Sequence, residues 1–239
     1  MAVSFYNFSL VKKFGIYFTL IGLMACSAGQ QPDVAVPTTE GLVAYYTFED
    51  NAKDQVGDNH ARSFNAPSFS YVNDAHKKAI KFSIGDKSRA LINNTFDYEF
   101  KTICLRVKAD VIDDNPAVVF VSDNPKKKFG LAGVVMKEEN GQEKLFFNIA
   151  SNPVSIPVVA GVWYHITLVS AGKNYGYYLN GSLIARGAIE EYKSSSNGEE
   201  ATMLGSSRIQ SIFFSGAIDD LRIYNRALKS SEIAVIAAN

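Results

Sequence analysis

Residues 163–186 read WYHITLVSAGKNYGYYLNGSLIAR, a segment with the pattern of a buried strand followed by a hairpin. In residues 163–169, aromatic and β-branched side chains occupy both alternating sets of positions, which is typical of a central strand that packs on two faces. Asn180-Gly181 then lies between two apolar runs, and this dipeptide readily adopts the two positive φ angles of a type I′ turn. We therefore predict a central strand and a β-hairpin here.

The chain from Gly41 onward repeats this pattern. Short runs rich in Val, Ile, Tyr and Phe are separated at close intervals by Gly, Asn, Asp and Pro, which is typical of many short antiparallel strands. A second Asn-Gly pair, Asn140-Gly141, joins residues 131–137 to residues 144–149 in a predicted hairpin. The sequence therefore predicts one all-β domain over residues 41–239.

Only the C-terminal residues suggest a helix. Ser230 or Ser231 is the predicted N-cap, Glu232 lies in the first turn, and Ile233 and Ile236 form one apolar stripe. We expect this short helix to cover one end of the domain.

The N-terminus has the pattern of a secretory signal. Lys12-Lys13 precede an uncharged apolar run over residues 14–25, which at about 1.5 Å per residue is too short to cross a hydrocarbon core of about 30 Å. Leu23-Met24-Ala25-Cys26 resembles the bacterial lipobox, which implies that Cys26 is lipidated and anchors the chain in a membrane. An ordinary cleaved signal, with Cys26 incidental, is the alternative.

Three segments follow from this interpretation: a signal peptide over residues 1–25, a flexible lipidated tether over residues 26–40, and the β domain over residues 41–239. Ser27 after the cysteine favours the outer membrane, and the missing acidic tract favours its inner leaflet. If Cys26 is lipidated, Cys104 has no disulfide partner, and its apolar context predicts a buried, inert thiol.

The composition excludes two classes of protein. Of the 239 residues 47% are hydrophobic, so the chain is not expected to be disordered as a whole. The 24 basic side chains equal the 24 acidic ones, which leaves no excess positive charge for nucleic acid.

Several segments resemble the laminin-G-like, concanavalin A-like jelly-roll domains. The residues that carry the resemblance lie in 41–48, 51–60, 78–82, 100–108, 163–166, 178–181 and 214–228. The resemblance implies an antiparallel two-sheet jelly-roll β-sandwich with a short C-terminal helix, and it places Trp163 in the core. Two departures are Arg106, where the family usually carries a Trp that serves as a core anchor or a ligand platform, and Lys229, where it usually has a helix-capping Ser.

Asp219 is the carboxylate whose position most needs an explanation. By strand alternation it is expected to share a face with Leu221 and Ile223, which is costly unless the carboxylate is paired, hydrogen-bonded or metal-bound. The resemblance implies a structural calcium ion held by Asp219, by Asp58 or Asn59, and by nearby backbone carbonyls. The alternative is that Asp219 accepts backbone hydrogen bonds and binds no metal.

The same superfamily includes glucanases, whose paired carboxylates lie on one strand. The nearest approach here is Glu138, Asn140 and Glu143, but this spacing runs through the predicted turn, so the side chains are not expected to share a face. His165 is expected to be a satisfied core histidine rather than a base. We therefore predict no catalytic residues and no enzymatic activity.

Binding is the remaining class of function. Tyr71, Tyr98, Tyr175 and Tyr192 lie in predicted loops or strand ends and are candidates for a sugar-binding platform. The expected function is a non-catalytic envelope lipoprotein whose domain binds glycan or acts in adhesion. The alternative is a structural or protein-interaction subunit of an envelope assembly, and glycoside hydrolysis is a third possibility.

Overall fold

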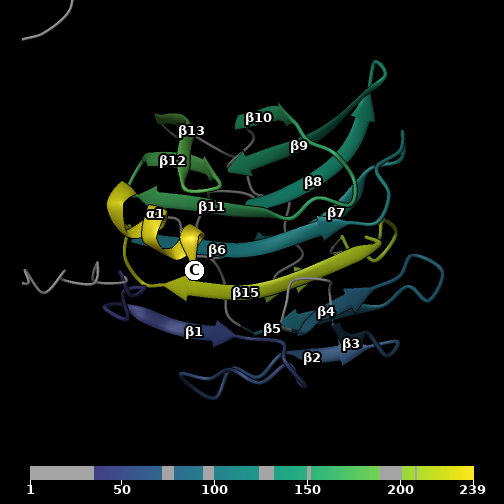
Figure 1. Cartoon of the computed structure of the whole chain (residues 1–239), viewed down its shortest axis with the longest axis horizontal. Helices are drawn as coiled ribbons and strands as arrows, with labels where there is room; N and C mark the ends of the chain where they lie inside the picture. The colour runs from purple at the N-terminus through teal and green to yellow at the C-terminus, as the bar shows by residue number, and fades with distance from the viewer. Residues whose placement is uncertain are drawn as a thin grey trace, which may run out of the picture. The chain divides into compact units, whose positions relative to one another are not determined.

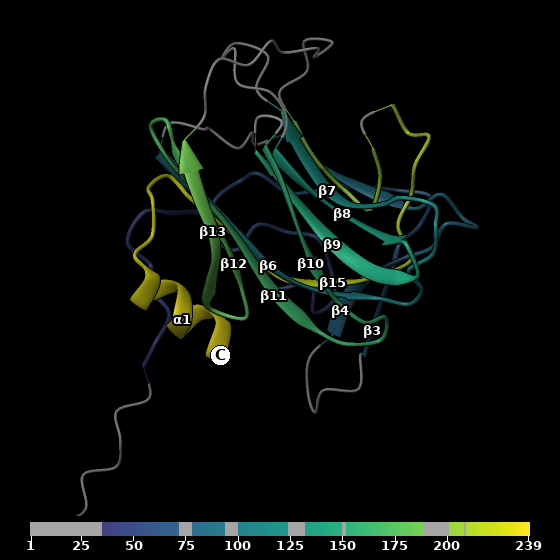
Figure 2. The same ribbon diagram turned by 90° about the horizontal axis from the view of Figure 1, so that it is seen from above.

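Two antiparallel β-sheets lie face to face in this protein, with one short helix on the outside (Figures 1 and 2). The structure, a computed structural model, describes residues 35–71, 78–93, 100–123, 132–149, 152–188, 201–207 and 209–239. The predicted two-sheet β-sandwich with a C-terminal helix is confirmed. Among the described residues, no helix has both the length and the apolar character to span a membrane.

The first sheet, sheet A, has eight strands in the order β13-β12-β11-β6-β15-β4-β3, with β1 pairing β15 beside β4. Its strands are β1 (Leu42–Tyr46), β3 (Ser68–Tyr71), β4 (Lys78–Phe82), β6 (Phe100–Ala109), β11 (Tyr164–Ala171), β12 (Asn174–Leu179), β13 (Ser182–Ala188) and β15 (Gly216–Tyr224).

Sheet B has seven strands in the order β10-β9-β8-β7-β14-β5-β2. They are β2 (Arg62–Phe64), β5 (Arg89–Ile92), β7 (Ala117–Asp123), β8 (Ala132–Glu139), β9 (Gln142–Ile149), β10 (Asn152–Pro157) and β14 (Ala201–Leu204).

The two sheets bury one apolar core between them. Leu105 of β6, Ile166 of β11 and Phe147 of β9 are fully buried there. Phe147 stacks on Tyr177 with ring centroids 5.3 Å apart, and the amide of Ile149 donates a 2.7 Å hydrogen bond to the Tyr177 hydroxyl. Because Tyr177 lies in β12 and the other two in β9, this contact joins the two sheets.

Both predicted hairpins are confirmed. Asn180-Gly181, with φ angles of 48° and 79°, connects β12 to β13, and Asn140-Gly141, with φ angles of 57° and 74°, connects β8 to β9. β11 is buried on both faces, as its sequence predicts, because the core covers one face and other side chains and the helix cover part of the other.

Helix α1 (Ser230–Ala238) packs on the face of sheet A that points away from sheet B, which we call the outer face (Figure 2). Ile233 and Ile236 are buried against it, as the apolar stripe predicts. The predicted serine N-cap is wrong: the N-cap is Lys229, whose amide donates a 2.7 Å hydrogen bond to the Glu232 carboxylate.

Cys104 lies under this helix in β6. It is fully buried, and burial raises the pKa of its thiol to about 12. The prediction of a buried, inert thiol is thereby confirmed.

Part of the predicted tether contacts the domain. Thr38 accepts a hydrogen bond on its carbonyl from the Tyr224 hydroxyl, and Glu40 accepts one from Arg226. Cys26, with the rest of residues 1–34, lies outside the described residues.

Candidate functional site

The candidate site is built on the outer face of sheet A, where strand register places polar side chains in two cross-strand rows. The first row runs from β11 to β1 and contains Thr167, Cys104, Arg222 and Tyr45. The second row is the next one along the strands on the same face, and it contains His165, Arg106 and Asp219. Neighbours in a row point to the same side of the sheet.

A β-bulge in β15 places Asp219 on this outer face. Ile218 before the bulge and Leu221 and Ile223 after it all pack in the core, so the chain gains one residue between them. Asp219 therefore lies opposite Arg106, and the predicted face shared with Leu221 and Ile223 is wrong. Strict alternation fails here because Asp220 adopts a left-handed φ of 52°.

Asp220 connects two members of the first row, Tyr45 and Arg222, in a buried network. Its Oδ1 accepts a 2.7 Å hydrogen bond from the Tyr45 hydroxyl and lies 3.0 Å from Nη2 of Arg222. The Arg222 guanidinium also lies 4.5 Å from the centroid of the Tyr45 ring. Burial, and then the nearby Asp220 carboxylate, raise the pKa of Tyr45 to about 12. Nothing local in the sequence marks this network, because Tyr45 lies 175 residues from Asp220 along the chain.

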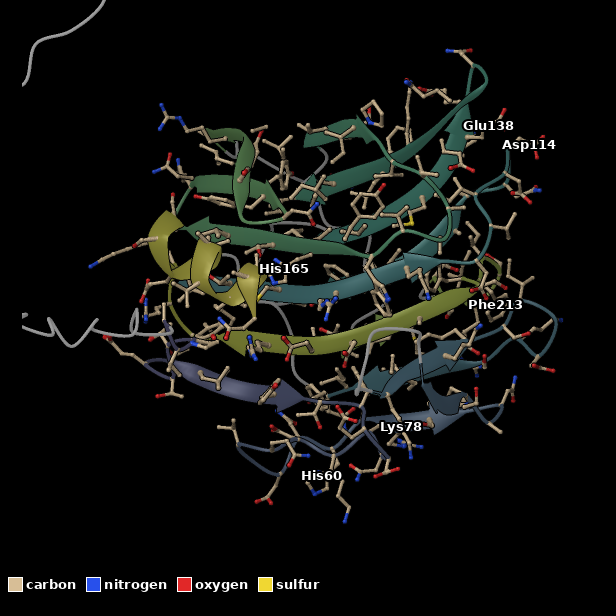
Figure 3. The ribbon with its side chains drawn as sticks, in the orientation of Figure 1. His60, Lys78, Asp114, Glu138, His165 and Phe213 are labelled. Carbon is tan, nitrogen blue, oxygen red and sulfur yellow. The ribbon has the colours of Figure 1, made fainter. Side chains whose placement is uncertain are left out.

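Several buried polar atoms on this face have no hydrogen-bond partner within the described part of the chain. They are both ring nitrogens of His165, Oγ1 of Thr167 and Nη1 of Arg222. His165 lies on β11 near the last turn of α1 (Figure 3), and burial lowers the pKa of its imidazole to about 4. It is buried, as predicted, but on the outer face and with no hydrogen-bond partner for its ring among the described residues, so the prediction of a satisfied core histidine is wrong.

Trp163, immediately before β11, lies on the same outer face. Its half-buried side chain packs on Ala79 of β4 and Ala217 of β15, both fully buried. Cζ of Arg106 and Nζ of Lys108 each lie 5.3 Å from the centroid of its ring system. The predicted core position of Trp163 is therefore wrong, and Arg106 occupies an outer-face position beside it.

Lys108 was not among the site residues predicted from the sequence, although the alternation of side chains along β6 indicates its position. Leu105 and Val107 are core residues, so Arg106 and Lys108, which alternate with them in β6, must both point outward. The result is an indole seated on two small side chains and flanked by two cations. Cation–π attraction keeps the guanidinium group of Arg106 and the ammonium group of Lys108 near the ring.

The loop with the predicted calcium ligands follows β1. Oδ1 of Asp54 accepts hydrogen bonds from the amides of Tyr45 and Val56, both at 3.0 Å, whereas its buried Oδ2 has no partner within the described residues. Asp58 is exposed and Asn59 half-buried. His60 of this loop is well separated from His165 (Figure 3).

Asp219, the third predicted ligand, accepts a 2.7 Å hydrogen bond from the amide of Asp220. This contact is of the kind that the metal-free alternative requires. No group of three or more His, Cys, Asp or Glu side chains that could hold a metal is found in the described ranges. A calcium ion would therefore depend on backbone and amide oxygens in addition to carboxylates, and calcium binding stays a prediction.

The pair Glu138 and Glu143 is arranged differently from the prediction. The two residues are direct cross-strand partners in the β8–β9 hairpin, so they share a face. The predicted separation is wrong because residues at equal distances from a two-residue turn pair with each other across the hairpin. Glu143 accepts a 2.7 Å hydrogen bond from the amide of Ala160, which gives this carboxylate a structural contact.

Tyr175, one of the four tyrosines of the predicted platform, is half-buried: its ring lies 5.0 Å from that of Tyr177 and packs against the core, and its role in sugar binding stays a prediction. Tyr98, Tyr192 and the side chain of Tyr71 lie outside the described residues.

The fold resembles several solved structures. Domain 4 of AbnA, a GH43 extracellular arabinanase from Geobacillus stearothermophilus in complex with arabinotriose, is 19% identical over 82% of this chain and 98% of that chain, with a TM-score of 0.64. The serotype D botulinum neurotoxin ligand binding domain in complex with N-acetylneuraminic acid is 16% identical over 83% of this chain and 50% of that chain, with a TM-score of 0.59.

A third solved structure, Trypanosoma rangeli sialidase in complex with the inhibitor DANA, is 18% identical. The match covers 85% of this chain but 33% of the sialidase, with a TM-score of 0.62. No curated protein sequence matches the chain.

A family model described as the concanavalin A-like lectin/glucanases superfamily matches residues 82–234. This range is more than half of the 239 residues, and the two antiparallel sheets agree with it. The chain therefore belongs to the concanavalin A-like lectin/glucanase superfamily.

Proposed function

We propose that this protein is a non-catalytic glycan-binding module, held at the bacterial cell envelope by lipid on Cys26. The observation that carries the proposal is Trp163, a half-buried indole on the outer face of sheet A, seated on Ala79 and Ala217. A rigid aromatic side chain beside a few polar groups is the usual element of a sugar site, because its face packs against the C–H groups of a sugar ring.

The solved structures support this proposal. AbnA domain 4, which this fold matches over nearly its whole length, was solved in complex with arabinotriose. A non-catalytic role is supported by the structural contacts of two outer-face carboxylates. Asp219 accepts an amide hydrogen bond, and Asp220 contacts Tyr45 and Arg222.

A protein-interaction role is the second candidate, because β13 is an edge strand of sheet A with two exposed apolar side chains. Leu183 is 45% exposed and Ile184 is 38% exposed. An edge strand offers unpaired backbone groups to a partner strand.

The test is binding of the purified full chain, in detergent, to a glycan array. We expect reproducible binding that Trp163→Ala abolishes. Phe64→Ala is the matched control, because Phe64 is a ring on sheet B that is likewise flanked by two cations, Arg62 and Arg89. If the wild-type chain binds no glycan, or if Trp163→Ala binds as well as wild type, the proposal is wrong.

Fractionation of the producing bacterium tests the lipid anchor on Cys26. The wild-type chain is expected in the membrane fraction of the producing bacterium and Cys26→Ser in the soluble fraction.

A further inference from the structure

We propose that the ligand at Trp163 is an acidic glycan, recognised through a carboxylate by Arg106 and Lys108. This inference rests on the proposed function and names the class of sugar that the same site takes.

Arg106 and Lys108 lie close together beside the indole of Trp163. Arg106 and Lys108 occupy alternate positions of β6, so both side chains project from the outer face, and both heads lie 5.3 Å from the ring centroid of Trp163. A ligand that reaches the indole therefore meets an ammonium and a guanidinium group at the same point.

A third cation extends this arrangement across the sheet. Lys108 and Lys81 are the two cross-strand neighbours of Ala217, one of the alanines on which the indole rests. Nζ of Lys81 lies 3.5 Å from Oδ2 of Asp110, but both side chains are well exposed, so solvent screens this pair. Lys81 thus adds a third cationic side chain to the outer face, next to Ala217, on which the indole rests.

The carboxylates of the site do not neutralise all of this charge. Lys108 forms no ion pair in the part of the chain that the structure describes. Asp219, which is only 4% exposed, lies opposite Arg106 in the strand register, so among the described residues the unpaired positive charge of the site is that of Lys108. A charge on the ligand is therefore the available partner for Lys108.

The geometry of the Arg106 guanidinium and the Lys108 ammonium groups favours binding of a carboxylate. A guanidinium group offers a planar fork that matches a carboxylate, and an ammonium group adds a compact point charge. A neutral sugar on the indole can offer its hydroxyl oxygens to these cations as hydrogen-bond acceptors, but it supplies no charge, and hydrogen bonds to an ionised acceptor are the stronger ones. The site therefore discriminates in favour of acidic sugars.

The experiment compares each acidic probe with its neutral counterpart. Trigalacturonic acid and its carboxyl-reduced form, and sialyllactose and lactose, are titrated calorimetrically into the full chain in detergent. At least one acidic probe is expected to bind about tenfold or more tightly than its counterpart, the equivalent of one charge-assisted contact. Added salt should reduce this difference.

Variants assign the difference to the two cations. Lys108→Gln, at a half-exposed position, and Arg106→Gln should each weaken binding of the acidic probe about tenfold and leave the neutral one unchanged. Arg106→Lys keeps the charge and should fall between wild type and Arg106→Gln. Arg62→Gln is the matched control, because it removes an arginine over an aromatic ring on sheet B.

The outcomes separate the two proposals. If acidic and neutral probes bind equally and Trp163→Ala abolishes both, the acidic class is wrong while glycan binding stands. If no probe and no array glycan binds the wild-type chain, both proposals fail. An acidic preference that survives both Lys108→Gln and Arg106→Gln also overturns the inference.

Discussion

His165 shows how the environment of one side chain sets its chemistry. It stands beside Arg106 in a row of the outer face, and its two ring nitrogens lack hydrogen-bond partners in the described part of the chain. Burial disfavours the charged imidazole most strongly. Asp220 favours that charge, whereas Arg222 and Arg106 oppose it, and together these effects lower the pKa to about 4. The folded protein therefore keeps His165 neutral at mildly acidic pH.

The stability of the protein should depend on pH through this residue. With a pKa of about 4 in the folded state against 6.5 when unfolded, only the unfolded chain takes up the proton between these values. His165 therefore makes the free energy of unfolding fall by about 3 kcal/mol as the pH drops from 6.5 to 4, and adds no further loss below. His165→Gln should lack this component when unfolding by urea is followed across that range.

Thr167→Val is the matched control, because its side chain is buried on the same face of β11 but does not titrate. It should change stability by a similar amount at each pH. A pH dependence equal to wild type in His165→Gln would contradict the assignment.

At the scale of elements, the turn between β12 and β13 also packs against helix α1. A Cβ atom added at Gly181 would lie 3.1 Å from Cα of Ala234 and 3.3 Å from Cβ of Ala237, both in α1. Gly141 has a similar φ of 74°, but an added Cβ there meets nothing within 4 Å. The two hairpins have the same turn chemistry and differ in what packs against the turn.

Gly181→Ala should therefore destabilise the protein more than Gly141→Ala. Both variants pay roughly 1 to 2 kcal/mol for a left-handed backbone with a side chain. Gly181→Ala must in addition move α1, for which we expect a further loss of about 1 to 3 kcal/mol, typical of overpacking. Urea unfolding of both variants measures the difference, and equal losses would show that α1 does not rest on this turn.

The sequence predicts those elements whose signal is local. Asn180-Gly181 specifies its turn by its own φ angles, and the buried residues of β11 follow from apolar side chains on both parities. The bulge at Asp220 is different, because one additional residue inverts the alternation, and nothing local marks the inversion. Consequently the sequence placed Asp219 on the wrong face.

The candidate site could be predicted only in part for a related reason. Arg106 stood out as a departure from the family pattern, and Lys108 follows from alternation along β6. That Trp163 lies outside the core depends on Ala79 and Ala217, which come from two distant strands. A packing surface made by residues of two distant strands forms only when the sheet is assembled.

At the scale of the whole molecule, the first and last strands of the domain are neighbours. β15 pairs with β4 up to Ile218 and with β1 from Leu221 onward, so Asp219 and Asp220 lie where its neighbour changes (Figure 1). The loop of Asp54 leaves β1 directly after Tyr46, which is paired with Leu221. A cation bound by this loop and by Asp219 would connect the two ends of the domain.

This arrangement sharpens the calcium prediction. A cation that binds only the folded protein raises its stability by about 2.7 kcal/mol at a hundred times its dissociation constant, or roughly 5 to 10 °C in melting temperature for a chain of this size. Millimolar calcium should therefore raise the melting temperature of the wild-type chain. Asp219→Asn and Asp58→Asn, which remove one charge each, should abolish the rise. Asp86→Asn, at an exposed position between β4 and β5, should retain it. A wild-type melting temperature that does not respond to calcium would leave Asp219 with its hydrogen-bonding role alone.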